Sequence, residues 1–282
     1  MTDFVYINGE YVDAAEARVA ATEPGLLFGF GLFETVRAYG GQLFRPEEHW
    51  QRLYRGAEAL GLAPGLEPPA LTATCHKLLV KSGQLDSAVR VSVYKGSDTD
   101  ILVIHLRSDW HYPSELYRVG AHVAVGRHRL NHKTPTAPLK TTSRLLNALT
   151  DAEAKKVGAL EGLLLNVDGE VAEGSRSNIF WGEGDVLSTP PLSTGCLAGV
   201  TRRIVLGLAE TKGIRVNEKV TDADGLKRAD EAFLSSTLLE VMPIQKIDGT
   251  PVRGACPGRL TMILRQAFRE LVIDEMGGPS AG

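Results

Sequence analysis

The 282-residue chain lacks the features that mark membrane, secreted and nucleic-acid-binding proteins. No stretch approaches 18 uninterrupted apolar residues, so we expect no membrane span. The first residues contain no basic segment followed by an apolar core, and we expect no signal peptide. The net charge of −3 lacks the basic excess that is typical of nucleic-acid binders. A small anionic substrate is still compatible with this charge, because one local cluster of arginines is enough to bind it.

Cysteine is also scarce. The three cysteines, Cys75, Cys196 and Cys256, are odd in number and widely spaced. They form no metal-ligand pattern and no disulfide framework, so we expect no metal site and a reduced, cytoplasmic location. The remaining composition, 43% hydrophobic and 23% charged residues, is ordinary for a globular protein.

The first part of the chain shows local hairpins and helices without regular βαβ alternation. Asn8-Gly9 and Gly40-Gly41 each separate two short apolar runs, which predicts two hairpins. Pro46 is expected to open a helix that ends at Gly61. Another helix is expected near residues 71–81, and strands at 89–94 and 101–106. This order indicates an α+β fold.

The polar, proline-containing segment RHRLNHKTPTAP separates the first part from the second. We therefore expect an N-terminal α+β domain at 1–126, a linker at 127–139 and a C-terminal domain at 140–282. The second domain is expected to contain helices at 143–157, 201–212 and 257–276, hairpins at 163–172 and 178–187, and strands at 214–220 and 231–235.

Lys140 is the first candidate for catalysis. It follows the linker and directly precedes a predicted helix, although a lone lysine is usually a solvated surface residue. A lysine that forms a Schiff base must be unprotonated when it attacks an aldehyde, and burial or nearby cations favour that state. Arg127, Arg129 and Lys133 of the linker are candidates for those cations.

Glu173 is the second candidate. Pyridoxal 5′-phosphate (PLP) enzymes need a group that keeps the pyridine nitrogen protonated, and a carboxylate at the end of a strand, followed by small residues, suits that role. The alternative is a surface glutamate beside a turn.

A phosphate group needs several hydrogen-bond donors. Val200 and Thr201 open a predicted helix, whose N-terminus favours anions. Thr237 follows a strand and adds a hydroxyl, and Arg52 adds a positive charge. Taken alone, the Gly-Val-Thr sequence also fits an ordinary helix start.

Together these pieces resemble the PLP-dependent fold-type IV enzymes, which include branched-chain and D-amino acid aminotransferases and 4-amino-4-deoxychorismate lyase. The resemblance covers nearly the whole chain, and Glu173 follows Lys140 by 33 residues, as in that family. It rests on the ordered segments FGFGLFETVRAYGGQLF, EEHWQRL, LKTTSRLLNAL, EGLLLNVDGEVAEGSRSNIFW, LAGVTRR and ADEAFLSSTLLEVMPIQKIDG.

The resemblance implies a small N-terminal α/β domain, a larger C-terminal pseudo-barrel domain and a homodimer whose active sites draw on both subunits. It implies that Lys140 forms the internal aldimine and moves the proton between the substrate and the cofactor, and that Glu173 pairs with the pyridinium nitrogen. The phosphate-binding residues implied are Arg52, Val200, Thr201 and Thr237, with residues 175–177 nearby.

The residues that choose the substrate are harder to assign. The resemblance places Phe33, Arg37 and Arg90 near an amino acid or 2-oxo acid substrate. The Arg-x-His cluster of D-amino acid aminotransferases is missing, and the branched-chain Arg-Pro pair is Arg90-Val91 here. For Arg176, anion binding and a surface salt bridge are both open.

Three functions follow from these patterns. The first is an aminotransferase that passes an amino group from an amino acid to a 2-oxo acid. The second is the lyase, favoured by the Leu-Lys-x-x-x-Arg-Leu match around Lys140 and Arg144. The third, a non-catalytic PLP-binding protein, is disfavoured because Lys140, Glu173 and the phosphate residues occur together. We favour the aminotransferase, because the lyase match is short.

Overall fold

The structure, a computed structural model, describes residues 3–108 and 110–277. The chain divides into two compact units. Unit 1 contains the described residues up to His111, the segment Leu139–Arg144 and the described residues from Asp274 onwards. Unit 2 contains Tyr112–Pro138 and Leu145–Ile273.

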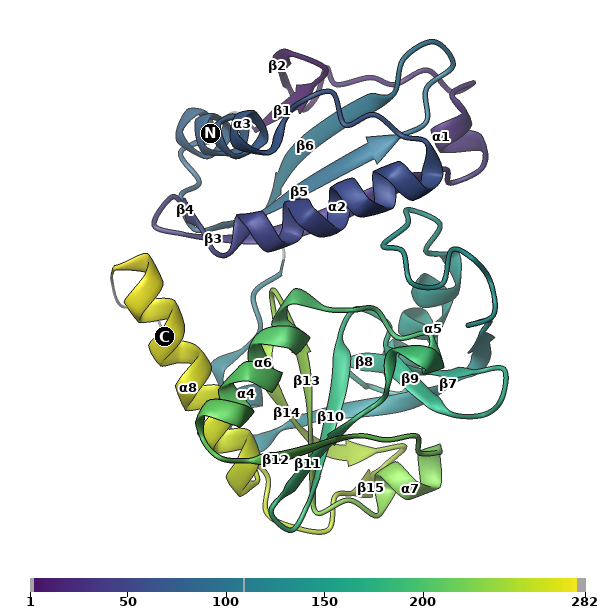
Figure 1. The fold of residues 1–282 in the computed structure, drawn as a ribbon, viewed down its shortest axis with the longest axis vertical. Helices are drawn as coiled ribbons and strands as arrows, with labels where there is room; N and C mark the ends of the chain where they lie inside the picture. The colour runs from purple at the N-terminus through teal and green to yellow at the C-terminus, as the bar shows by residue number, and fades with distance from the viewer. Residues whose placement is uncertain (1–2, 109, 278–282) are drawn as a thin grey trace. The chain divides into compact units, whose positions relative to one another are not determined.

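Unit 1 is built on a six-stranded antiparallel sheet in the order β2-β1-β6-β5-β3-β4 (Figure 1). The first hairpin turns at Asn8 and Gly9, whose φ angles of 43° and 109° fit the Asn-Gly signal in the sequence. The strands are β1 (Phe4–Ile7), β2 (Glu10–Asp13), β3 (Gly31–Tyr39), β4 (Gln42–Leu43), β5 (Ser87–Tyr94) and β6 (Ile101–Arg107).

Helices α2 (Pro46–Leu60) and α3 (Pro68–Ser82) cover one face of this sheet, and α1 (Pro24–Leu27) precedes β3. Helix α2 begins with a proline at its first position and ends at Gly61, whose φ of 61° suits a glycine cap. Alternate residues of β3, such as Leu32 and Val36, enter the apolar core beside Trp50 of α2. The opposite residues of β3 therefore lie on the other face of the sheet.

Unit 2 contains a nine-stranded mixed sheet in the order β12-β11-β10-β13-β14-β7-β8-β9, with β15 paired to β14. Strands β7 and β8, β14 and β7, and β11 and β12 pair in parallel. The strands are β7 (Ala121–Leu130), β8 (Glu161–Asn166), β9 (Val171–Gly174), β10 (Asn178–Glu183), β11 (Val186–Thr189), β12 (Arg215–Glu218), β13 (Glu231–Ser236), β14 (Glu240–Ile247) and β15 (Thr250–Pro251).

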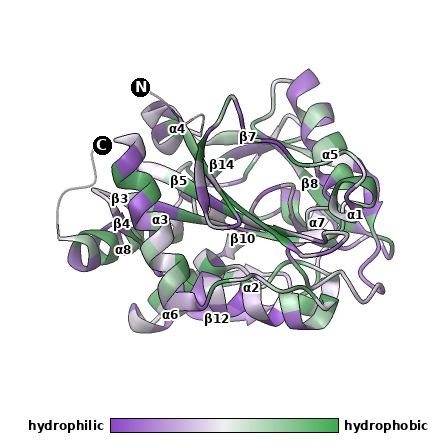
Figure 2. Ribbon diagram, turned by 90° about the horizontal axis from the view of Figure 1, so that it is seen from above, coloured by the Kyte–Doolittle hydropathy of each residue, from purple (hydrophilic) through white to green (hydrophobic). Residues whose placement is uncertain are grey.

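The helices of unit 2 are amphipathic or short. Helices α5 and α8 carry both hydrophobic and hydrophilic bands along their length (Figure 2), as expected of helices with one face on a core. They are α4 (Ser114–Val119), α5 (Leu145–Lys156), the 3₁₀ turn η1 (Leu192–Thr194), α6 (Val200–Thr211), α7 (Ala223–Lys227) and α8 (Arg259–Met276). The α+β fold class is confirmed. Within the described ranges, no helix has the length and apolarity needed to cross a membrane.

The chain passes from unit 1 to unit 2 at Tyr112, whereas the sequence suggested a linker at 127–139. Strand β7 runs across the expected boundary at residue 126, and its last four residues, 127–130, are the basic stretch that resembled a linker. That stretch is part of a strand because it pairs in parallel with β8, a contact that local sequence signals do not reveal. The expected C-terminal domain began at Lys140, but Leu139–Arg144 belongs to unit 1.

Candidate active site

Lys140 lies on a short segment that is hydrogen-bonded to the start of β3. The Phe33 amide donates to the Lys140 carbonyl oxygen at 3.0 Å, and the Thr142 amide donates to the Gly31 carbonyl oxygen at 2.8 Å. Gly31 allows this close approach, because a Cβ there would lie 2.9 Å from the Thr142 hydroxyl oxygen, and also 2.6 Å from the carbonyl oxygen of Val93 on β5. The backbone on both sides of Lys140 is thus fixed against a sheet strand.

Three basic side chains meet at the ring of Phe33, which is 7% exposed. The Arg90 Cζ lies 3.7 Å from the ring centroid, the Lys140 Nζ 4.6 Å and the Arg144 Cζ 5.9 Å. Burial lowers the pKa of Arg90, and the positive charges of Arg107 and Arg144 lower it further. The structure therefore places Phe33, Arg90 and Lys140 together and adds Arg144, which the sequence left without a firm role.

The three linker cations have partners of their own in unit 2. Arg127 is paired with Glu153, and Lys133 with Asp168 at 3.1 Å. Arg129 donates to backbone carbonyl groups, including that of Gly126 at 2.9 Å. In unit 1, the cations that share a ring with Lys140 are Arg90 and Arg144.

Arg52 lies on α2 and binds a fully buried carboxylate, Glu34, on the core-facing side of β3. Arg52 Nε donates to Glu34 Oε1 at 2.6 Å and Nη2 to Oε2 at 2.7 Å. His49 Nδ1 lies 2.8 Å from Glu34 Oε2. Burial opposes ionisation of Glu34, but Arg52 and His49 outweigh it and hold the pKa of Glu34 at about 2. Sequence reasoning missed Glu34, although a carboxylate between Leu32 and Val36 on an apolar strand face is a recognisable signal for a buried partner.

Arg37 lies on the same face of β3 as Phe33, four residues further along. Its Cζ lies 4.6 Å from the Tyr39 ring and 4.1 Å from the Trp110 ring. Its Nη1 donates to the Ala38 carbonyl oxygen at 2.8 Å. The two aromatic rings hold the guanidinium in place.

Glu173 lies on β9 and is buried, with 7% of its surface exposed. Its Oε2 accepts a hydrogen bond of 2.8 Å from the Leu197 amide. Leu197 precedes helix α6 by three residues. Burial, and secondarily the charge of Glu173, raise the pKa of the neighbouring Cys196 thiol to about 11. Glu173 therefore lies against the loop that leads into α6.

Val200 and Thr201 form the first turn of α6, as the sequence predicted. Amides in a first helical turn have no acceptor within the helix, and the helix dipole favours an anion beside them. The loop before them is closely packed, because a Cβ on Gly199 would lie 2.1 Å from Asn178 Oδ1. Asn178 Nδ2 in turn donates to the Leu197 carbonyl oxygen at 2.8 Å. The same loop thus joins Glu173 to the α6 N-terminus.

Thr237 follows β13 directly. Residue Ser235 of β13 is paired with Asn178 of β10, which holds the loop before α6. Thr237, two residues beyond Ser235, therefore lies at the same end of the sheet as Asn178. The Ser236 hydroxyl fixes the turn there by accepting a 3.1 Å hydrogen bond from the Leu239 amide.

The turn between β9 and β10 is fixed by Glu161, a buried carboxyl that sequence reasoning also missed. Glu161 Oε1 accepts from the Arg176 amide at 2.6 Å and from the Ser177 hydroxyl at 2.9 Å. Burial raises the pKa of Glu161. The Arg176 side chain binds Asp151 at 3.1 Å and the Leu160 carbonyl oxygen at 2.9 Å, so the salt bridge that was one of its two interpretations is present.

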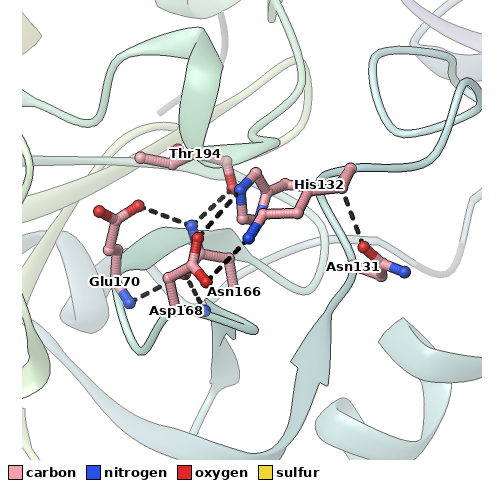
Figure 3. A network of polar contacts seen from close by, with 7 residues as sticks. Asn131, His132, Asn166, Asp168, Glu170 and Thr194 are labelled. Atoms are coloured by element: carbon pink, nitrogen blue, oxygen red, sulfur yellow. Dashed lines mark hydrogen bonds and ion pairs between the residues drawn. The ribbon is translucent and has the colours of Figure 1, made fainter.

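A polar network fixes the hairpin that leads to Glu173 (Figure 3). At its centre, Asn166 Nδ2 donates to Glu170 Oε2 at 2.7 Å, and Asn166 Oδ1 accepts from the amides of Asp168 and Glu170. Asp168 also pairs with His132 at 3.3 Å, on the segment that follows β7. These contacts connect that segment to the β8–β9 hairpin.

The amino-transferase class IV family model matches residues 31–247 of the chain. The chain belongs to the class IV aminotransferase family. It is 30% identical to the branched-chain-amino-acid aminotransferase of Escherichia coli (strain K12), over 97% of this chain and 94% of the relative. It is also 30% identical to a D-alanine aminotransferase of Staphylococcus epidermidis, over 95% of this chain and 97% of the relative.

Solved structures of branched-chain aminotransferases share the fold. The E. coli branched-chain amino acid aminotransferase has a TM-score of 0.90 at 29% identity, covering 96% of this chain and 95% of its own. A branched-chain amino acid aminotransferase solved with pyridoxamine 5′-phosphate has a TM-score of 0.88 at 27% identity, covering 96% and 94%. The predicted fold type and the aminotransferase prediction are confirmed, and these relatives give no support to the lyase over it.

Proposed function

We propose that this class IV aminotransferase uses PLP and moves an amino group between an amino acid and a 2-oxo acid, with Lys140 as the catalytic residue. Class IV aminotransferases use this cofactor. The observation that carries the assignment of Lys140 is its placement: the backbone is held against β3, and the amine lies beside Phe33 with Arg90 and Arg144. Nearby cations favour the neutral form of an amine, which is the nucleophilic one.

The residues of unit 2 fit a phosphorylated pyridine. Glu173 is a buried carboxylate held by the Leu197 amide, and the first turn of α6 begins three residues later. A carboxylate on β9 that contacts the loop leading into a helix N-terminus suits a ligand with a protonated ring nitrogen and a phosphate. In this proposal Val200, Thr201 and Thr237 hold the phosphate and Glu173 holds the ring nitrogen. Arg52 of unit 1, two of whose guanidinium nitrogens bind Glu34, is proposed to add a positive charge for the phosphate.

When bound, PLP supplies the aldehyde that takes up the amino group and the ring that withdraws electrons from the substrate. The Lys140 amine is proposed to remove the proton from the substrate Cα and to move it between the substrate and the cofactor. Glu173 keeps the ring nitrogen protonated, and the amides of Val200 and Thr201 hold the phosphate throughout the reaction.

Phe33, Arg37 and Arg90 share one face of β3 and β5 and are proposed to contact the substrate. Arg176 was the fourth candidate. Its guanidinium is occupied by Asp151 and a backbone carbonyl group, and we propose a structural role for it.

We also propose a cytoplasmic homodimer with shared active sites. The family resemblance supports the dimer, and the free thiols of all three cysteines support a reducing compartment. Light scattering on the purified protein is expected to give twice the 30.4 kDa chain mass. A mass of one chain at micromolar concentration would contradict the dimer.

The decisive experiment adds one amino donor at a time, from a panel of L- and D-amino acids, to PLP-loaded protein without any acceptor. An aminotransferase converts the bound cofactor to its amine form, and the matching 2-oxo acid appears in an amount equal to the enzyme. A second assay supplies aminodeoxychorismate and measures p-aminobenzoate. Release of p-aminobenzoate, with no donor in the panel changing the cofactor spectrum, would show the lyase instead.

A further inference from the structure

Arg144 is the one cation at the Phe33 ring that the proposed function does not use. It lies four residues after Lys140, within the segment Leu139–Arg144 that is fixed to β3. Its guanidinium carbon is 5.9 Å from the Phe33 centroid, on a ring that also has Arg90 at 3.7 Å. The two arginines and Lys140 therefore meet at the same ring in unit 1.

The side chains that the structure brings to the Phe33 ring are basic. Guanidinium groups stay protonated in proteins, so Arg90 and Arg144 repel each other. The factors that shift the pKa of Arg90 are its own burial, Tyr94, Arg107 and Arg144. Among these, Tyr94 favours the charged form of Arg90, in part through a side-chain hydrogen bond. An anion placed beside the two guanidinium groups would relieve this repulsion.

An independent observation comes from Ser92. It pairs directly with Phe33 across β3 and β5, and the alternation of β5 places it on the same face as Arg90. Ser92 has no exposed surface, and among the residues that the structure describes its hydroxyl has no hydrogen-bond partner. A buried hydroxyl without a partner is costly and marks a place where an acceptor is expected.

We propose that Arg144 acts with Arg90 to bind a carboxylate of the substrate, which makes Arg144 a specificity-determining residue. The proposal rests on the proposed aminotransferase function, because every amino acid and 2-oxo acid carries such a group. Arginine suits the role, since its planar fork can donate two parallel hydrogen bonds to one carboxylate. The carboxylate is either the one beside the reacting carbon or a second one on an acidic side chain.

The test compares Arg144→Gln, Arg144→Lys and the wild type with alanine and with glutamate as donors, in the enantiomer that the donor panel finds active. Arg144→Gln is expected to lower kcat/KM by about 10- to 100-fold through KM, the range for loss of a charged hydrogen bond. A loss with both donors identifies the carboxylate beside the reacting carbon, and a loss with glutamate alone identifies the side-chain carboxylate. Arg144→Lys keeps the charge and is expected to recover part of the loss.

Arg55→Gln is the matched control, since Arg55 is an exposed arginine of the same unit. The absorbance of the lysine-bound cofactor and the melting temperature of Arg144→Gln are expected to equal those of the wild type. Unchanged kcat/KM for both donors would overturn the proposal. So would a loss that accompanies loss of bound cofactor, because Arg144 would then hold the cofactor or the fold. A wild type inactive with every donor would contradict the proposed function itself.

Discussion

Replacing Glu34 with glutamine removes a charge that the structure buries completely. Glu34 accepts two hydrogen bonds from Arg52 and one from His49, and its pKa is lowered to about 2 from an ordinary value of 4.5. The difference of about 2.5 pKa units corresponds to about 3 kcal/mol of folding stability at neutral pH. Solvent screening does not reduce this value, because the side chain has no exposed surface.

The pH dependence has a defined sign. A carboxyl whose pKa is lowered by folding stabilises the fold fully above its unfolded pKa, and that contribution is lost as the pH falls through its folded pKa. For Glu34 the loss lies between about pH 4.5 and pH 2. About 2 of the 3 kcal/mol are expected to be lost already at pH 3. Protonation of His49 is not expected to offset the stability lost in Glu34→Gln, because burial of His49, and the nearby charges of Arg52 and Lys140, lower its pKa.

Urea denaturation at pH 7 and pH 3 measures this effect. Glu34→Gln is expected to be about 3 kcal/mol less stable than the wild type at pH 7, and the difference is expected to shrink to about 1 kcal/mol at pH 3. Glu58→Gln, an exposed position on the same helix as Arg52, controls for a generic loss of charge. A difference that stays the same at both pH values would show that the Glu34 charge does not stabilise the fold, as would a Glu34→Gln protein as stable as the wild type at pH 7.

Three further substitutions test unit 2. Burial raises the pKa of Glu161, so its ionised form lowers the stability of the fold as the pH rises above about 4.5. Glu161→Gln keeps the hydrogen-bond acceptor, and urea denaturation at pH 8 is expected to show a loss of less than about 1 kcal/mol in the free energy of unfolding. Glu161→Leu removes the acceptor and is expected to lose about 3 kcal/mol. Equal losses would contradict this. Glu173→Gln is expected to weaken PLP binding about 10- to 100-fold in fluorescence titration of the apoprotein, and an unchanged affinity would argue against its role. Thr201→Ala is expected to weaken binding of PLP about fivefold and leave unphosphorylated pyridoxal unaffected, whereas Thr211→Ala at the other end of the helix changes neither. An equal effect on pyridoxal would exclude phosphate binding by Thr201.

The local parts of the fold were predictable because their signals lie within a few residues of each other. The Asn8-Gly9 turn has the positive φ angles that such a hairpin requires, and Pro46 and Gly61 bound α2 as expected. Strand β14 was not assigned, and it contains Pro243, which disfavours a strand in sequence. Pro243 is tolerated just before Ile244, where the ladder with β7 begins.

The candidate site shows the same division. Lys140, Glu173 and the α6 start were found because their order along the chain matches the family. Glu34 and Glu161 were missed because a buried carboxyl looks like any other polar residue until its partners are known. Glu34 binds Arg52, which is 18 residues away, and Glu161 binds a turn 15 residues away. Arg144 was seen as a sequence match, but only the fold of Leu139–Arg144 along β3 places it beside Phe33.

The most direct test of the central claim is covalent attachment of PLP to Lys140. The protein is loaded with PLP, reduced with borohydride to make the linkage permanent, digested and analysed by mass spectrometry, alongside Lys140→Ala and the control Lys133→Ala. We expect a phosphopyridoxyl group on the peptide that contains Lys140 in the wild type and in Lys133→Ala, and neither label nor transamination in Lys140→Ala. Labelling of another lysine, or full transamination by Lys140→Ala, would contradict it.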